Sequence, residues 1–278
     1  RDIKKNSLYV AKKGINLDGN DYIKISIEKG ALAIVCNKLP EELNEGITYI
    51  IVHDTPKALG ILSSNFYDNP SKKLNLIGIT GTNGKTSVAF FLYQLFTTHS
   101  LKCGLFSTVK IKYLDREFHN SRTTPDIITT NKLLNEMVKE DVNFCFMEVS
   151  SHGITQDRIY GLSFKAGVFT NLTHDHLDYH GNFKNYRDTK KQFFDNLPHS
   201  AFALTNIDDK NGSFMLQNTK AKKYTYATEF HADYMAKILE CQFSGMLLKI
   251  QNHEVWSSLL GHFNSQNLLA VYAIADLF

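Results

Sequence analysis

The chain has 278 residues, of which 43% are hydrophobic and 21% are charged, and its formal net charge is +3. These values describe an ordinary globular protein of about two domains, and so small a charge argues against a nucleic-acid partner. No signal peptide and no apolar run of membrane-spanning length is apparent, so we expect a cytoplasmic protein that does not insert into membranes. We also expect it to be a monomer.

The first 67 residues predict a small α/β unit. Strands are expected at 7–11, 31–35 and 49–52, with a helix over about 22–29. A second helix is expected to begin with Thr55 as its N-cap and Pro56 at its first position. Residues 68–73 are polar and contain a proline, which is typical of a linker. We therefore predict an N-terminal domain over residues 1–72 and a central domain over residues 73–278.

Residues 74–87, LNLIGITGTNGKTS, predict a phosphate-binding loop. A short apolar strand precedes Gly81 and Gly84, and an apolar helix pattern follows Lys85 and Thr86. Glycines allow backbone N–H groups to approach a polyphosphate, and the helix N-terminus adds free donors and partial positive charge. We expect Lys85 to reach the β and γ phosphates and Thr86 to hold Mg²⁺. The usual form of this motif needs a glycine at position 79, where Ile79 stands instead.

From residue 74 onward, strands and helices alternate, which predicts an α/β fold with a mostly parallel sheet flanked by helices. Residues 103–111 read as extended, further strands are expected at 144–147, 166–169 and 202–206 and around Tyr224 and Leu247, and helices at 127–137, 183–194 and the C-terminus. Glu148 directly follows the expected strand at 144–147, and Asn171 lies two residues after the expected strand at 166–169. Because ligands bind at the carboxyl ends of parallel strands, the phosphate loop, Glu148 and the segment after Asn171 are expected to meet at one edge.

The segment Asn171–Gly181, NLTHDHLDYHG, concentrates groups that bind metals or orient carboxylates. One interpretation is a metal-dependent hydrolase, because His174, His176 and Asp178 follow the H-x-H-x-D spacing. Tyr179 interrupts that motif before His180, and such a hydrolase would not use a phosphate loop. Lys190 lies on a predicted helix and, judged from the residues alone, is a surface lysine. The four cysteines form no C-x-x-C pair, and we interpret them as buried thiols in a reducing compartment; they are Cys36, Cys103, Cys145 and Cys241.

Five ordered motifs together resemble the Mur ligase family, and most closely its MurE type. They are GITGTNGKT at 78–86, TTPD at 123–126, EVSSHG at 148–153 with Gln156 and Arg158, NLTHDHLDYHG at 171–181 and GHFN-x-x-N at 261–267. The resemblance covers essentially the whole chain and accounts for the glycine spacing. It implies an ATP- and Mg²⁺-dependent ligase that adds the third amino acid, diaminopimelate or lysine, to UDP-N-acetylmuramoyl-L-alanyl-D-glutamate in peptidoglycan synthesis, through an acyl phosphate.

The same resemblance implies roles for individual residues. The catalytic set is Lys85, Glu148, His176 and Lys190. Thr86 and Glu148 would hold Mg²⁺, His176 would help to hold a second Mg²⁺, and Lys190, as a carbamate, would supply further metal-binding oxygens. The ATP-binding residues would be Gly81, Thr82, Asn83, Gly84, Lys85, Thr86, Ser87, Asn264 and Asn267. The UDP-substrate would contact Asn16, in a uridine-side loop, and Thr123, Thr124, Ser150, Gln156 and Arg158.

Two parts of the family pattern are missing from the sequence. The usual start of the N-terminal domain is reduced to Arg1, and the C-terminal domain that selects the amino acid is absent, so we expect the native polypeptide to continue past Phe278. We also expect these 278 residues to be inactive by themselves. A regulatory nucleotide-binding module without ligase chemistry is the other alternative.

Overall fold

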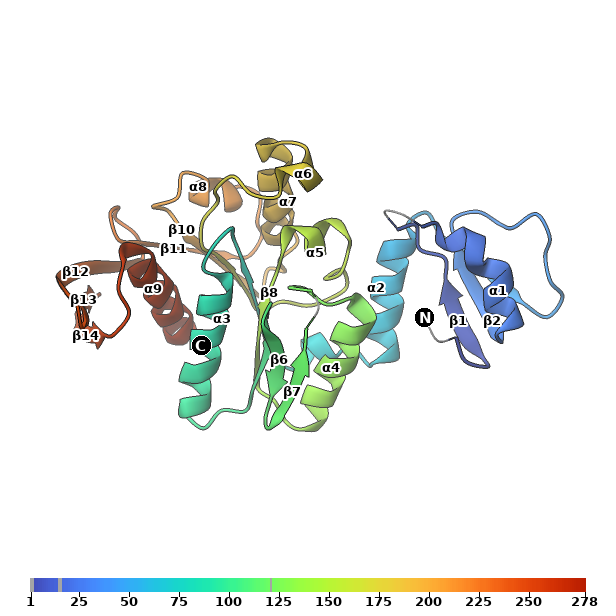
Figure 1. Cartoon of the computed structure of the whole chain (residues 1–278), viewed down its shortest axis with the longest axis horizontal. Helices are drawn as coiled ribbons and strands as arrows, with labels where there is room; N and C mark the ends of the chain where they lie inside the picture. Colours follow the sequence, from blue (N-terminus) through green and yellow to red (C-terminus); the bar gives the residue numbers. More distant parts are fainter. Residues whose placement is uncertain (1–2, 15–16, 121) are drawn as a thin grey trace.

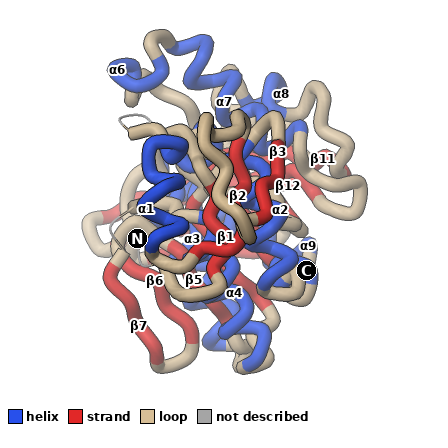
Figure 2. Tube along the Cα trace, turned by 90° about the vertical axis from the view of Figure 1, so that its right-hand side faces the viewer, coloured by secondary structure: helices blue, strands red, loops and turns tan. Residues whose placement is uncertain are grey.

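The computed structural model describes residues 3–14, 17–120 and 122–278, and its strands form two separate sheets (Figure 1). The smaller is a three-stranded parallel sheet of β1 (Ser7–Val10), β2 (Ala31–Cys36) and β3 (Thr48–Ile51). A 3₁₀ helix (Gly19–Tyr22) leads into α1 (Ile23–Glu28), which packs on one face of this sheet. Figure 2 views the molecule from the side on which this small unit lies.

The helix α2 (Thr55–Phe66) joins the small unit to the rest of the chain. Its N-cap is Asp54, whose side chain accepts from the backbone N–H of Lys57, so the predicted N-cap at Thr55 is wrong by one residue. A β-carbon on Gly60 would lie 2.4 Å from the carbonyl oxygen of Tyr160, so only glycine allows α2 to approach this closely. The small unit is therefore joined to the large one by tight backbone packing.

The segment predicted as a polar linker is packed rather than loose. It contains a 3₁₀ helix (Pro70–Lys72), and Ser71 is fully buried. The Ser71 hydroxyl accepts a hydrogen bond of 3.0 Å from the backbone N–H of Ser163. The division into domains at residues 72 and 73 stays a prediction.

The larger sheet has eleven strands in the order β14-β13-β12-β11-β10-β9-β4-β8-β5-β6-β7. Strands β12 to β5 in this order run parallel, and an antiparallel pair is added at each edge. This confirms the predicted α/β class with a mostly parallel sheet. The strands are β4 (Asn75–Thr80), β5 (Cys103–Phe106), β6 (Lys110–Tyr113), β7 (Arg116–His119), β8 (Phe144–Glu148), β9 (Ala166–Phe169), β10 (Phe202–Asn206), β11 (Lys222–Ala227), β12 (Tyr234–Gln242), β13 (Gly245–Ile250) and β14 (His253–Ser257).

Helices cover both faces of the large sheet. On one face α3 (Lys85–Thr98) and α9 (His262–Leu277) pack over Ile77 and Ile79 of β4. On the other face lie α4 (Ile127–Lys139), α5 (Ser151–Thr155) and α7 (Phe183–Asp195). A β-carbon on Gly78 would lie 2.5 Å from the Phe193 ring, so this glycine lets α7 pack directly on β4. Short helices α6 (Leu177–His180) and α8 (Gly212–Met215) complete the fold.

Two further expectations need correction, and three strands, β7, β12 and β14, were not predicted. Residues 103–111 are not one extended run, because residues 107–109 separate β5 from β6. Cys241 is exposed, whereas the other three cysteines are buried as expected. Within the described residues, no helix has both the length and the apolar character that crossing a membrane requires.

Candidate active site

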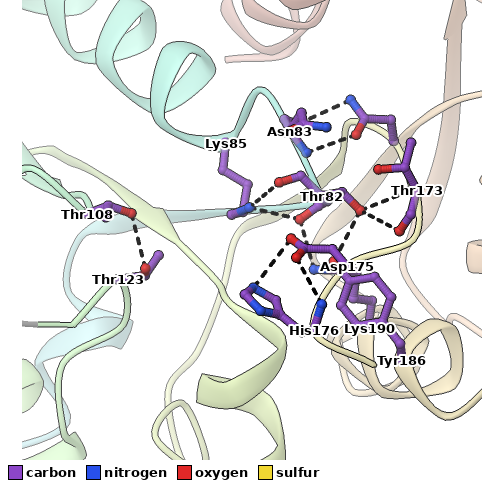
Figure 3. Close-up of polar contacts among 12 residues, drawn as sticks. Thr82, Asn83, Lys85, Thr108, Thr123, Thr173, Asp175, His176, Tyr186 and Lys190 are labelled. Carbon is purple, nitrogen blue, oxygen red and sulfur yellow. Dashed lines mark hydrogen bonds and ion pairs between the residues drawn. The ribbon is translucent and has the colours of Figure 1, made fainter. Parts of the chain in front are cut away.

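Three adjacent strand ends bring the predicted polar segments together. β4 lies between β8 and β9 in the sheet, and the chain continues from it into the phosphate loop. β8 ends at Glu148, and β9 leads to Asn171 two residues past its end. Figure 3 shows Lys85, Thr82, Asp175, His176 and Lys190 around this one edge.

The phosphate loop is held in shape by the segment that follows β9. Thr82 donates its backbone N–H to the carbonyl oxygen of Asn171 at 2.8 Å. The Asn171 side chain accepts from the Asn83 N–H at 2.9 Å and donates to the Asn83 carbonyl at 3.2 Å. The Thr82 hydroxyl accepts from the backbone N–H of Thr173 at 2.9 Å. The hydroxyls of Thr86 and Ser87, in contrast, make no hydrogen bond within the described residues, so they remain available to a ligand.

Two lysines converge on the carbonyl oxygen of Gly81. Lys85 Nζ donates to it at 2.9 Å and to the carbonyl of Thr82 at 2.7 Å, and Lys190 Nζ donates to it at 2.8 Å. Burial lowers the pKa of Lys85, and the nearby Glu148 opposes this. Lys190 is only 1% exposed, and burial together with the charge of Lys85 holds its pKa well below the usual value. The interpretation of Lys190 as a surface lysine is therefore wrong.

The buried Lys190 predicts a dependence of stability on pH. Between its lowered folded pKa and the ordinary value of 10.5, the unfolded chain binds a proton that the folded chain does not, so stability contributed by this group rises with pH. We expect Lys190→Met to remove this contribution. The free energy of unfolding of the unaltered chain, minus that of the variant, should then increase from pH 7 to pH 9 in urea titrations. Lys184→Met, on the exposed side of the same helix, is the control, and a difference that does not change with pH would refute the assignment.

Glu148 is a fully buried carboxylate without an ion-pair partner among the described residues. Its Oε1 accepts from the backbone N–H of Thr108 at 2.7 Å, and its Oε2 accepts from the Thr108 hydroxyl at 3.1 Å. The Thr108 and Thr123 hydroxyl oxygens lie 3.1 Å apart (Figure 3). A buried carboxylate is costly unless a cation or hydrogen bonds compensate it, and carboxylates are preferred ligands of Mg²⁺. Glu148 therefore fits a divalent-cation site.

The histidines of residues 171–181 do not form the metal-hydrolase arrangement. The His174 ring packs on Phe183, with centroids 4.9 Å apart, whereas the His176 ring contacts His152 at 4.8 Å. His176 Nε2 lies 3.5 Å from Asp175 Oδ2. Among the residues that the structure describes, no group of three or more His, Cys, Asp or Glu side chains is arranged to hold a metal ion. The H-x-H-x-D interpretation is therefore not supported.

The residues expected to bind the UDP-substrate already bind one another. Arg158 Nη1 donates to the carbonyl of Thr124 at 2.8 Å, and Arg158 Nε donates to Gln156 Oε1 at 3.1 Å. Ser150 caps α5, because its hydroxyl accepts from the Gly153 N–H. Thr124 is fully buried, and its hydroxyl donates to the backbone carbonyl of Glu148, so it stabilises the end of β8. These substrate-binding roles stay predictions, and Asn16 lies outside the described residues.

The two asparagines of α9 differ in position. Asn267 is buried, and a β-carbon on Gly84 would lie 2.5 Å from its Oδ1, so it packs against the phosphate loop. Asn264 is half-buried and donates to the carbonyl of Leu260 at 2.8 Å. Both lie on the helix that packs against α3, and their contact with ATP stays a prediction.

The contact between Gly84 and Asn267 can be tested by stability. Gly84 has φ +85°, and Gly46 has φ +79° with open space around it. We expect Gly46→Ala to cost about 1–2 kcal/mol, because only the left-handed conformation is penalised. Gly84→Ala should cost about 1–3 kcal/mol more, because Asn267 must also move. Urea unfolding of both variants measures the difference, and equal losses would show that the Asn267 contact is unimportant.

Several residues at this edge were not singled out from the sequence. Thr108, which binds Glu148, lies in the turn between two strands that the sequence did not separate. Tyr186 places its hydroxyl 3.1 Å from that of Thr82 and was read only as part of a helix. Asp209 accepts a hydrogen bond of 2.7 Å from the Leu172 N–H and so anchors the start of the histidine-rich segment.

Comparisons with known proteins agree with this geometry. Residues 79–275 match the Mur ligase middle domain, and residues 1–67 match the Mur ligase family catalytic domain. Proteins named UDP-N-acetylmuramoyl-L-alanyl-D-glutamate--2,6-diaminopimelate ligase are similar along the whole chain: that of Phocaeicola vulgatus is 53% identical and that of Bacteroides fragilis 51%. The chain spans 57% of the length of each of these two relatives.

Solved structures show the same fold. A structure of a UDP-N-acetylmuramoyl-L-alanyl-D-glutamate--2,6-diaminopimelate ligase matches with a TM-score of 0.86 and 26% identity, over 99% of this chain and 57% of that one. MurF from Thermotoga maritima, solved in complex with ADP, matches with a TM-score of 0.64 and 17% identity over 99% of this chain and 61% of that one, which supports the fold alone. The match to the middle-domain family covers more than half of the sequence, and the chain therefore belongs to the Mur ligase family.

Proposed function

We propose that this chain provides the ATP-binding and UDP-substrate-binding parts of a ligase that adds the third amino acid to UDP-N-acetylmuramoyl-L-alanyl-D-glutamate. The main support is the arrangement at one sheet edge. The phosphate loop, the half-buried Lys85 and buried Lys190 on Gly81, and the buried carboxylate of Glu148 meet there, beside the Gln156–Arg158 pair.

The phosphate loop is suited to the triphosphate of ATP. Its glycines leave the backbone accessible, and α3 begins at Lys85 with free N–H donors directed at the loop. Lys85 now donates to two loop carbonyls. We propose that it exchanges them for phosphate oxygens when ATP binds, and so stabilises charge on the transferred phosphoryl group.

Glu148 and its neighbours fit Mg²⁺, the cation that such a ligase requires. Thr86 and Glu148 would hold one Mg²⁺ and His176 would help to hold a second, together with Lys190 if the buried amine is converted to a carbamate. A neutral amine is the form that reacts with CO₂, and the lowered pKa of Lys190 favours that form. When bound, Mg²⁺ supplies positive charge to the phosphate oxygens.

Gln156 and Arg158 suit the acidic dipeptide. The planar guanidinium of Arg158 can bind a carboxylate through two parallel hydrogen bonds. Its donors are now taken by Gln156 Oε1 and the carbonyl of Thr124, which a substrate carboxylate would replace. The N-terminal unit would bind the uridine end of the same substrate.

The proposed reaction has two steps. An oxygen of the D-glutamyl carboxylate attacks the γ-phosphorus of ATP, and the bond to the β-phosphate oxygen breaks, giving an acyl phosphate and ADP. The amine of the incoming amino acid then attacks the acyl carbon, inorganic phosphate leaves, and the nitrogen loses a proton as the amide forms. Diaminopimelate is the proposed amino acid, because the relatives at about 50% identity carry it in their names.

An assay of the full-length protein tests the proposal. The protein is incubated with ATP, Mg²⁺, the UDP-muramoyl-dipeptide and either diaminopimelate or lysine, and the products are identified by mass spectrometry. We expect a tripeptide product and ADP only when ATP and diaminopimelate are both present. Nucleotide binding without ligation would favour a regulatory module, and hydrolysis without ATP would favour a hydrolase.

A further inference from the structure

His152 lies at the centre of a group of aromatic rings beside the candidate metal site. Its ring packs on Tyr179 with centroids 4.0 Å apart, and on His176 at 4.8 Å in an edge-to-face arrangement of 86°. The His180 ring lies 5.8 Å away, is buried, and has no hydrogen-bond partner for its Nε2 among the described residues. His152 therefore touches the predicted metal ligand His176 and is not itself among the predicted ligands.

Tyr179 connects this group to the residues expected to bind the dipeptide. Its hydroxyl accepts a hydrogen bond of 3.2 Å from Gln156 Nε2. Gln156 in turn accepts from Arg158 through its side chain, and its backbone carbonyl accepts from Lys12 Nζ of the N-terminal unit at 2.8 Å. One tyrosine thus joins the candidate dipeptide site on one side to His152 on the other.

The conformation of His176 shows why such support is needed. This residue has φ +51°, a left-handed conformation that is uncommon for histidine, and its side chain is 47% exposed. Its contact with Asp175, 3.5 Å between Nε2 and Oδ2, is too long for a strong hydrogen bond. The ring contacts of His176 are with His152, at 4.8 Å, and more distantly with Tyr186, at 6.2 Å, so His152 is the nearer of the two rings that restrain its orientation. Metal-binding histidines depend on such surroundings.

We propose that Tyr179 and His152 are positioning residues, which set the orientation of the His176 ring according to the occupancy of the Gln156–Arg158 site. A carboxylate bound there would compete for the Gln156 and Arg158 donors and so change the Gln156–Tyr179 bond. The Tyr179 ring would transmit this change through His152 to His176. This inference rests on the proposed function, because it takes the dipeptide site and the metal site from it.

Three substitutions in the full-length protein separate the parts of the proposal. Tyr179→Phe keeps the ring and removes only the hydroxyl, so we expect the KM for the UDP-muramoyl-dipeptide to rise about 2- to 10-fold, as for one lost hydrogen bond. Tyr179→Leu and His152→Leu remove rings, so we expect Mn²⁺ binding in the presence of ADP, followed by electron paramagnetic resonance, to weaken about 10-fold. The double leucine variant should lose little more than either single variant, because both act through one contact.

Tyr160→Phe and Tyr160→Leu are matched controls, because Tyr160 is exposed and outside the site, and its hydroxyl makes no hydrogen bond within the described residues. Circular dichroism checks folding, and Tyr179→Phe still tests the Gln156 link if the leucine variants fail to fold. The proposal is overturned if Mn²⁺ binding by both leucine variants stays within about two-fold of the unaltered protein, if the Tyr160 variants lose as much, or if Tyr179→Phe leaves the KM unchanged. Absence of ligation by the unaltered protein would contradict the proposed function, whereas the Mn²⁺ measurements would still decide this inference.

Discussion

Replacing Lys85 by alanine in the full-length protein should lower kcat for ligation about 10²- to 10³-fold, the usual cost of removing one group that stabilises transition-state charge. The fold should survive, because the Gly81 carbonyl keeps its hydrogen bond from Lys190. Lys85→Arg should not restore activity, since the larger planar guanidinium cannot take the place of a compact ammonium among the loop carbonyls. Initial rates at saturating ATP, together with circular dichroism, measure both effects.

Lys184→Ala provides the control for the Lys85 variant. It also removes a lysine, but from an exposed position on α7, and it should leave the rate unchanged. A Lys85→Ala protein that retains more than about a third of the unaltered rate would show that the loop lysine does not act on the phosphoryl group.

Glu148→Gln should have opposite effects on activity and on stability. The amide can still accept from the Thr108 N–H and donate to the Thr108 hydroxyl, so the local hydrogen bonds survive. Removing a buried charge that has no ion-pair partner among the described residues should leave the free energy of unfolding equal or higher. Ligation should nevertheless fall about 10²-fold or more, because a carboxylate ligand for Mg²⁺ is lost. Urea unfolding and steady-state rates over a range of Mg²⁺ concentrations measure the two effects.

Glu117→Gln is the matched control for the Glu148 variant. Glu117 forms an exposed pair of 2.9 Å with Lys110, and such pairs contribute little, so both stability and rate should change slightly at most. If Glu148→Gln instead destabilised the protein and left the rate unchanged, the carboxylate would have a structural role and no part in binding the cation.

The sequence predicted the central architecture because the strands of the large sheet and the helices that cover it differ clearly in the spacing of their hydrophobic residues. It did not predict β7, since all four residues from Arg116 to His119 are exposed and carry no buried face. The burial of Lys190 could have been found. Tyr186, Lys190, Phe193 and Phe194 follow helical spacing on one stripe of α7, and all four are buried. A lysine that stands within an otherwise apolar stripe of a helix predicts that the lysine is buried. The distribution of charged residues alone does not predict this.

The candidate site was predicted in part, and for physical reasons. The strand-end rule placed Glu148 and Asn171 beside the phosphate loop, because parallel neighbours end at the same edge. The rule does not give the partners of these residues, since hydrogen bonds such as Thr108 to Glu148 join a turn to a strand end that is 40 positions away in the sequence. The aromatic contacts of His152 depend likewise on how α5 packs against the segment of Tyr179, which no local pattern encodes.

The central claim is that the triphosphate, the divalent cation and the acidic dipeptide meet at this one edge of the sheet. The most direct measurement is a crystal structure of the full-length protein with Mn²⁺ and a non-hydrolysable ATP analogue, with the metal located by anomalous scattering. We predict a Mn²⁺ peak within ligand distance of the Thr86 hydroxyl and the Glu148 carboxylate, with the phosphates on residues 81–87. A metal bound elsewhere, or a nucleotide that leaves this loop empty, would contradict the account.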